Sequence, residues 1–279
     1  MFAGFNLKLS NEFFYNNFQY YIDIAKESYK KCSQSITSEI EDAIINHFEE
    51  GTPLDGNIIL KKWFPKYSVD VFISHSHADE DLANAFAGWL YEKFNITSFV
   101  DSNVWGYIDD LLGILNDNYS HKRRNGDYGY IYEHESCKKA SQYTNIMLLM
   151  SLQTIIDNTE SVFFLNTDKS VNVIDENGLS STYSPWIYAE LLCADLIRKK
   201  PLSEYRDKYF KENFAINAAT ESRAELKITY NISTNNLKSL NEKNLIDWKE
   251  RYKNEHNVIP MDLLYKMFVN EVSNGNNSY

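Results

Sequence analysis

The sequence predicts an α/β fold in which helices cover both faces of a parallel sheet. Strand-like and helix-like segments alternate through the middle of the chain, the pattern of repeated strand–helix–strand units. The strand-like segments 69–73, 96–100 and 162–165 are short and mostly apolar, as expected of strands that are buried on both faces. Hydrophobic residues make up 43% of the 279-residue chain, which is enough for a packed core.

Helical segments are expected between and after these strands. Apolar residues recur at helical spacing over 82–90 and again over 146–156. A further helix is expected over 184–197, because Ser184 is a favourable N-cap and Pro185 is favoured at the first helical position. The resulting strand–helix alternation is typical of one doubly covered sheet.

Residues 1–66 are predicted to form a helical extension outside the sheet. Apolar side chains recur every three or four residues over 13–25 and again over 36–47. Gly51 and Pro53 then interrupt the helical pattern. We interpret this extension as a helical cap or a dimerisation module.

The main domain is predicted to span residues 67–272, and residues 273–279 form a polar tail. Within this domain, residues 102–140 contain several glycines and show no clear periodicity, so they are interpreted as an irregular insertion. Such an insertion could serve as a lid or as a partner surface. The last strand is expected over 224–232, followed by a helical segment that reaches Met267.

Charge and cysteine content exclude several classes of protein. The formal net charge is −11, and no basic stripe offsets it, so direct binding of DNA or RNA is not expected. The 3 cysteines are widely spaced, which is typical of a reduced, cytoplasmic protein. No apolar run approaches the ~20 residues that a membrane span requires, and residues 1–10 do not resemble a signal peptide.

Polar residues follow the predicted strands at the edge where ligands bind in such folds. In a flavodoxin-like sheet of order 2-1-3-4-5, the ligand crevice lies outside the carboxyl ends of strands 1 and 3. Ser74 and His75 end the first predicted strand, and Asp101 follows the second. The third strand leads into the helix that carries Glu190. We therefore expect these side chains to face a common crevice.

Trp186 and Glu190 are spaced four residues apart and should share one face of their helix. An aromatic wall beside a carboxylate can stack a flat ring and can hold the carboxylate in a partly dry site. The alternative is a core tryptophan beside a surface glutamate, and the spacing alone favours that alternative.

The segment from His75 to Asp79 is similar to the His-x-His-x-Asp-His zinc motif of metallo-β-lactamase-like hydrolases. Glu80 stands where that motif has its last histidine, so no metal site is predicted. The alternative is a polar strand-to-helix turn in which Asp79 favours the start of the following helix electrostatically.

Three segments, in this order, resemble the boxes of TIR (Toll/interleukin-1 receptor) domains. The first resembles the opening strand and turn of that family, the second its second strand, and the third its Ser-x-Trp-x-x-x-Glu segment. The likeness extends over about residues 67–200, and Ile187 occupies a position where many TIR domains have cysteine. The three segments are residues 70–76 (DVFISHS), 96–101 (ITSFVD) and 184–190 (SPWIYAE).

The resemblance implies an NAD+-cleaving enzyme. In enzymatic TIR domains the glutamate of the third segment is catalytic, which implies that role for Glu190. NAD+ would be the substrate, without a metal or a further cofactor. The side chains implied to bind the substrate are Ser74, His75, Asp101, Ser184 and Trp186.

The resemblance extends to stand-alone bacterial TIR proteins, including those of Thoeris antiphage systems. Some of these convert NAD+ into a cyclic or conjugated ADP-ribose signal, which implies a separate effector protein that reads the product. Many TIR domains complete their site across a neighbouring subunit, which implies a homo-oligomer. The rival interpretation is a non-catalytic TIR interaction module, in which Glu190 has no chemical role.

Overall fold

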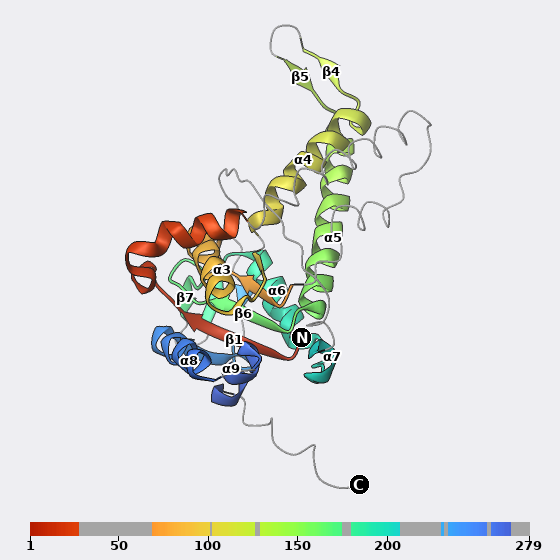
Figure 1. Cartoon of the computed structure of the whole chain (residues 1–279). Coiled ribbons are helices and arrows are strands. Elements are labelled where there is room, and N and C mark those ends of the chain that lie inside the picture. The colour runs from red at the N-terminus through yellow and green to blue at the C-terminus, as the bar shows by residue number, and fades with distance from the viewer. Residues whose placement is uncertain are drawn as a thin grey trace.

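The computed structural model describes residues 1–27, 69–100, 102–125, 129–174, 180–206, 230–231, 234–255 and 258–268. Its centre is a five-stranded sheet of order β10-β1-β6-β2-β3 (Figure 1). Every neighbouring pair in this sheet is parallel, which confirms the predicted α/β class. The strands are β1 (Ala3–Lys8), β2 (Val71–Ser74), β3 (Ser98–Val100), β6 (Ser161–Leu165) and β10 (Lys238–Asn241).

The N-terminal segment contributes a strand to the interior of this sheet. The predicted helical extension 1–66 is therefore wrong for residues 3–8, which pair with β6 on one side and β10 on the other. Apolar side chains at alternate positions, Ala3, Phe5 and Leu7, are the local signal for this strand. A 3-10 helix (Asn11–Asn17) follows, and residues 18–27 are helical as expected. The helix expected over 36–47 lies outside the described residues.

The predicted neighbours β3, β2 and β6 are found in the expected order, but the last strand differs from the prediction. The fifth strand of the sheet is β10, and the described part of 224–232 is the short strand β9 (Tyr230–Asn231). Strand β9 joins a separate antiparallel sheet with β7 (Val173–Ile174) and β8 (Ser180–Thr182). Helices α8 (Glu242–Asn254) and α9 (Pro260–Phe268) form the helical segment expected before Met267.

The segment 102–140, expected to be irregular, is largely helical. Helix α4 (Ser102–Tyr119) follows β3 and packs beside α5 (His134–Asn158). A short hairpin of β4 (Arg123–Arg124) and β5 (Tyr130–Ile131) joins the two helices and projects from the body of the molecule (Figure 1). Glycine costs a helix only about 1 kcal/mol relative to alanine, so packing against α5 can outweigh the glycines that suggested a loop.

The two faces of the main sheet carry separate layers of helices. Val71, Ile73 and Phe163 belong to the face covered by α3 (Glu80–Phe94), α8 and α9. Phe72 and Val162, one position away, belong to the opposite face, which α5 and α6 (Pro185–Leu196) cover. This alternation follows from the two-residue period of a strand. The same alternation determines the face of the sheet to which each side chain at the strand ends points.

A buried ionic cluster fastens helices to the amino-terminal edge of the sheet. Glu160, only 2% exposed, precedes β6 and accepts two hydrogen bonds from Arg206, at 2.7 and 2.9 Å. Arg206 ends α7 (Ser203–Arg206) and also pairs with Asp262 of α9. Tyr265 of α9 donates to Glu160 at 2.9 Å. Because a buried carboxylate needs such partners, this cluster holds α7 and α9 at the edge opposite the strand ends discussed below.

Among the described residues, no helix combines the length and the apolar composition needed to cross a membrane.

A backbone contact between two helices generates the first prediction. A Cβ atom on Gly88 of α3 would lie 1.9 Å from the carbonyl oxygen of Tyr21. We therefore expect Gly88→Ala to lower the free energy of unfolding by about 1–3 kcal/mol, because the helices must separate. Gly113→Ala in α4 is the matched control, since its Cβ would meet no atom within 4 Å. Chemical denaturation measures both, and a Gly88→Ala variant as stable as the parent would contradict the close approach.

Candidate functional site

Polar residues gather at the carboxyl ends of the main strands. In parallel α/β sheets this edge is where ligands bind, because the loops that leave the strands diverge there. Each of the five strands ends in or is followed by at least one such residue, and the order of the sheet sets them side by side. They are Ser102 near β3, Ser74 and His75 at β2, Asn166 and Thr167 at β6, Lys8 and Ser10 at β1, and Asn241 and Glu242 at β10.

Glu190 lies on α6 at the junction of β2 and β6. Its neighbours on the helix, Ile187 and Leu191, pack against Phe164 near the end of β6. Phe164 in turn pairs in register with Ser74 of β2. Glu190 is 2% exposed, so its carboxylate sits in a dry environment. This part of α6 lies near the switch point of the sheet, where β3 flanks β2 on one side and β6 flanks it on the other.

Ser74 belongs to the same face of the sheet as α6. It lies two residues beyond Phe72, which clusters with Cys193 and Ala194 of α6, and strand alternation gives both side chains the same direction. Ser74 is fully buried, and its Oγ makes no hydrogen bond with any of the described residues. A buried hydroxyl without a partner costs about 1–3 kcal/mol, so a polar ligand at this position would recover that cost.

The start of α6 supplies an aromatic wall and a helix cap. Ser184 caps the helix as predicted, because its Oγ accepts a hydrogen bond from the Ile187 amide at 3.2 Å, and Pro185 is the first helical residue. Trp186 is half-buried and packs against the α5–α6 face of the core. Trp186 therefore stands one helical turn before Glu190, whereas the Ser184 hydroxyl is engaged by the helix itself. Asp101 lies outside the described residues.

The turn after β2 contains two histidines, His75 and His77. His75 is 3% exposed, and its Nδ1 lies 3.3 Å from the carbonyl oxygen of Ile73, so that nitrogen carries the proton. His77 is exposed. No group of three or more His, Cys, Asp or Glu side chains in the described part of the chain could hold a metal ion.

Asp79 ties the loop after β2 to the loop after β6. Its buried carboxylate accepts hydrogen bonds from Ser76 Oγ at 3.1 Å and from Thr167 Oγ1, and it pairs with Lys169 Nζ at 3.1 Å. Lys169 also donates to the Ala78 carbonyl oxygen at 2.8 Å. These contacts fix the spacing of the two loops at the switch point. Thr167 and Lys169 had no signal in the sequence, because their role depends on the pairing of β2 with β6.

Cys193 lies one turn beyond Glu190 but is poorly suited to nucleophilic chemistry. Burial, together with the nearby carboxylates of Asp157 and Glu190, raises the pKa of the Cys193 thiol to about 11. The thiol is therefore protonated near neutral pH, and only the thiolate is an effective nucleophile. Cys193 is therefore not a candidate nucleophile, although it shares this part of α6 with Glu190.

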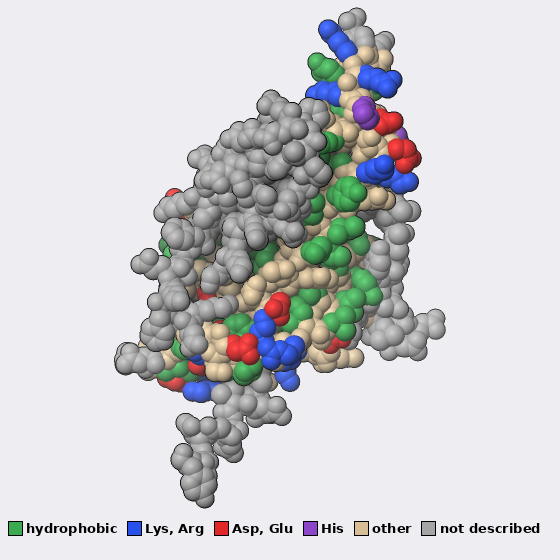
Figure 2. Space-filling view, turned by 90° about the vertical axis from the view of Figure 1, so that its right-hand side faces the viewer, with side chains coloured by type: hydrophobic (Ala, Val, Ile, Leu, Met, Phe, Trp, Pro, Cys, Tyr) green, Lys and Arg blue, Asp and Glu red, His purple; other side chains and the backbone are tan. Residues whose placement is uncertain are grey.

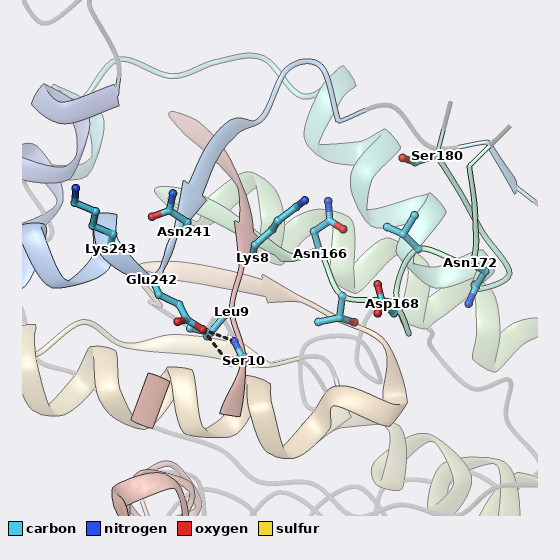
Figure 3. Close-up of a pocket in the computed structure, with 12 residues that line it drawn as sticks. Lys8, Leu9, Ser10, Asn166, Asp168, Asn172, Ser180, Asn241, Glu242 and Lys243 are labelled. Atoms are coloured by element: carbon cyan, nitrogen blue, oxygen red, sulfur yellow. Dashed lines mark hydrogen bonds between the residues drawn. The ribbon is translucent and has the colours of Figure 1, made fainter. Parts of the chain in front are cut away.

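A second feature of the same edge is a cavity of about 1040 Å³ beside the ends of β1, β6 and β10 (Figure 3). Lys8, Asn166 and Lys243 are among its lining residues, and none of the six predicted site residues lines it. Sequence reasoning missed this cavity because it assigned the segment of β1 to a helical extension. The alternation at Ala3, Phe5 and Leu7 was the signal that could have revealed it.

Comparisons with known proteins give no match: no protein-family model, no curated protein and no solved structure is similar to this chain. Functional inference therefore rests on the residues and their arrangement. Of the predicted site residues, Ser74 lies on β2, and Trp186 and Glu190 lie on α6, the helix that packs over the ends of β2 and β6. His75 adjoins this group through the backbone of β2.

The Asp79 network generates the second prediction. Asp79→Asn keeps the shape of the side chain but removes the charge that pairs with Lys169. We expect the free energy of unfolding to fall by about 1–3 kcal/mol, because buried hydrogen bonds are weakened. We also expect faster amide hydrogen exchange over residues 166–172. Asp81→Asn, an exposed position in the same turn of chain, is the control, and equal exchange in the two variants would show that Asp79 does not hold the loop.

Proposed function

We propose that this chain cleaves the bond between nicotinamide and ribose in NAD+, with Glu190 as the catalytic carboxylate. The observation that carries the proposal is the position of Glu190, buried on α6 over the paired ends of β2 and β6. The likeness of three segments to TIR domains supports the same assignment. Trp186 and the buried hydroxyl of Ser74 would line the substrate site beside it.

The chemistry suits a single carboxylate in a dry environment. As the N-glycosidic bond lengthens, its electron pair leaves with nicotinamide, which becomes neutral, and the ribose gains oxocarbenium character. The Glu190 carboxylate stabilises that positive charge, as carboxylates do in glycoside hydrolysis. Exclusion of water strengthens this electrostatic interaction. Because the leaving group is neutral, no strong general acid is required.

The ribosyl carbon must then accept a nucleophile. Capture by water yields ADP-ribose and a proton, whereas capture by a nucleophilic atom of the adenosine portion yields a cyclic product. A second substrate would give a conjugate. The likeness to stand-alone bacterial TIR proteins favours a cyclic or conjugated signalling nucleotide, which a separate effector protein reads in antiphage defence in the cytoplasm.

Exposed apolar side chains support self-association as part of this proposal. Tyr143, Ile146 and Met150 of α5 are 62%, 57% and 51% exposed, and Leu196 at the end of α6 is 75% exposed. Figure 2 shows hydrophobic side chains gathered along this side of the molecule. Because patches of this kind often mark protein interfaces, we expect a homo-oligomer. Since Glu190 is buried in the single chain, we also expect turnover to depend on assembly or on a trigger.

The same apolar surface favours a second candidate function, a non-catalytic interaction module. In that case the chain would assemble through α5 and α6, and Glu190 would only contribute to the core. The two functions differ in one measurable property, the dependence of nicotinamide release on the Glu190 carboxylate.

Replacement of that carboxylate is the third prediction. Glu190→Gln preserves size and removes charge, so we expect the fold to persist and nicotinamide release from NAD+ to fall by about 10²-fold or more. Glu135→Gln makes the same change at an exposed position of α5 and should leave turnover unaltered. Mass spectrometry of NAD+ incubated with lysates, with and without phage challenge, measures release and identifies the ribosyl product by its mass.

Each outcome assigns a function. Nicotinamide release that requires Glu190 supports the enzymatic function. The mass of the ribosyl product then distinguishes hydrolase, cyclase and transferase activity. Equal release by Glu190→Gln and the parent would refute the role of Glu190. If the parent assembles but releases no nicotinamide in any condition, the interaction module becomes the better description.

A further inference from the structure

An exposed row of side chains runs along α5 with the spacing of a coiled-coil seam. Its members alternate at intervals of four and three residues, and all of them are exposed. They are Lys139, Tyr143, Ile146, Met150 and Gln153. A row with this spacing lies on one side of a helix and matches a second helix that carries the same pattern. In Figure 2 hydrophobic side chains follow this side of the molecule.

We propose that a second copy of this chain covers the row, with its α5 antiparallel to the first. Tyr143, Ile146 and Met150 form the apolar centre of the row and are 62%, 57% and 51% exposed. Their removal from water is the main favourable contribution to association. The proposal rests on the self-association that the proposed function expects, and it gives that self-association a geometry.

The charged ends of the row favour one register of the two helices. When Ile146 of one copy lies level with Met150 of the other, Lys139 lies level with Asp157 at both ends of the pair. Asp157 continues the row four residues after its last exposed member. It pairs with Lys200 at 2.6 Å but keeps 44% of its side chain exposed. Because a carboxylate has several acceptor positions, Asp157 can also pair with the lysine of a second copy.

The distribution of charge favours the antiparallel over the parallel arrangement. Over residues 117–139, at the outer end of α4 and α5, basic side chains slightly outnumber acidic ones, whereas the whole chain has a formal net charge of −11. The excess negative charge therefore lies outside this projecting part. Antiparallel helices keep the two acidic bodies at opposite ends of the pair, and parallel helices would bring them together. Like charges in contact oppose association.

Apolar side chains at both ends of this surface can extend the contact. Three side chains of α5 are too few for a stable interface, which buries roughly 800 Å² per partner. Lys200, which follows α6, pairs with Asp157, so the end of α6 lies beside the end of α5, and Leu196 there is 75% exposed. At the other end of α5 the hairpin exposes Tyr130 and Ile131, at 60% and 51%. Antiparallel pairing brings each hairpin toward α6 of the other copy, the helix that carries the proposed catalytic carboxylate.

Analytical ultracentrifugation of the full chain, without NAD+, tests this fourth prediction. We expect a dimer whose population rises with concentration. Ile146→Lys should raise the dissociation constant of the dimer by about 100-fold or more, because the interface would bury a charge without a partner. Ile246→Lys is the matched control, since Ile246 is 40% exposed on α8, away from the row, and should leave the dimer unchanged.

Two neighbouring lysines test the register. Lys139→Glu places a carboxylate level with Asp157 of the other copy and should raise the dissociation constant roughly tenfold. Lys138→Glu makes the same change at an exposed position outside the row and should leave the dimer unchanged. Equal weakening by the two variants would overturn the register.

Disulfide trapping tests the orientation. When copies carrying Ile146→Cys are mixed with copies carrying Met150→Cys, mild oxidation should join one variant to the other, and mass spectrometry of the linked peptides identifies the bond. Parallel helices would instead join like variants, which would overturn the antiparallel arrangement. A parent that stays monomeric at submillimolar concentration, or a dimer that Ile146→Lys leaves intact, would overturn the proposal. Glu190→Gln should dimerise like the parent, so this result is separate from that of NAD+ cleavage.

Discussion

The pairing of β1 with β6 is the constraint on which the rest of the structure depends. Phe5 of β1 pairs with Phe163 and stacks on it with ring centroids 4.9 Å apart, and the Tyr265 ring is parallel to that of Phe5 with centroids 6.2 Å apart. Tyr265 also donates to Glu160, so the central strand, α9 and the buried ionic cluster support one another. At the other end of the same strand, Lys8 reaches the cavity. One strand thus organises both edges of the sheet.

The carboxyl edge is divided into two regions that share a single loop. Glu190 of α6 lies at the junction of β2 and β6, and the ends of β1, β6 and β10 surround the cavity. Thr167 belongs to both regions, because it lines the cavity and also donates to Asp79 across the switch point. An occupant of the cavity would therefore contact the loop that Asp79 ties to the end of β2. Coupling between sites requires such a shared physical element.

Local signals account for what the sequence predicted correctly. The strands β2, β3 and β6 are apolar runs, and α6 begins with a cap that Ser184 and Pro185 specify by themselves. The sequence did not reveal β1, because its short alternation is followed by a longer stretch with helical spacing. It also could not reveal the link between Asp79 and Thr167, since strand pairing creates that contact. The proximity of Ser74 to α6 likewise depends on register.

The position of β1 has a consequence for how the chain is made. β1 leaves the ribosome first among the described strands, yet its partners β6 and β10 follow more than half a chain length later. The apolar side chains of Phe5 and Leu7 therefore stay unpaired, and accessible to other nascent chains, until β6 and β10 have been synthesised. Contacts of such long sequence separation slow folding and favour misassembly. Yield in the cell should consequently depend on chaperones that shield the first strand during translation.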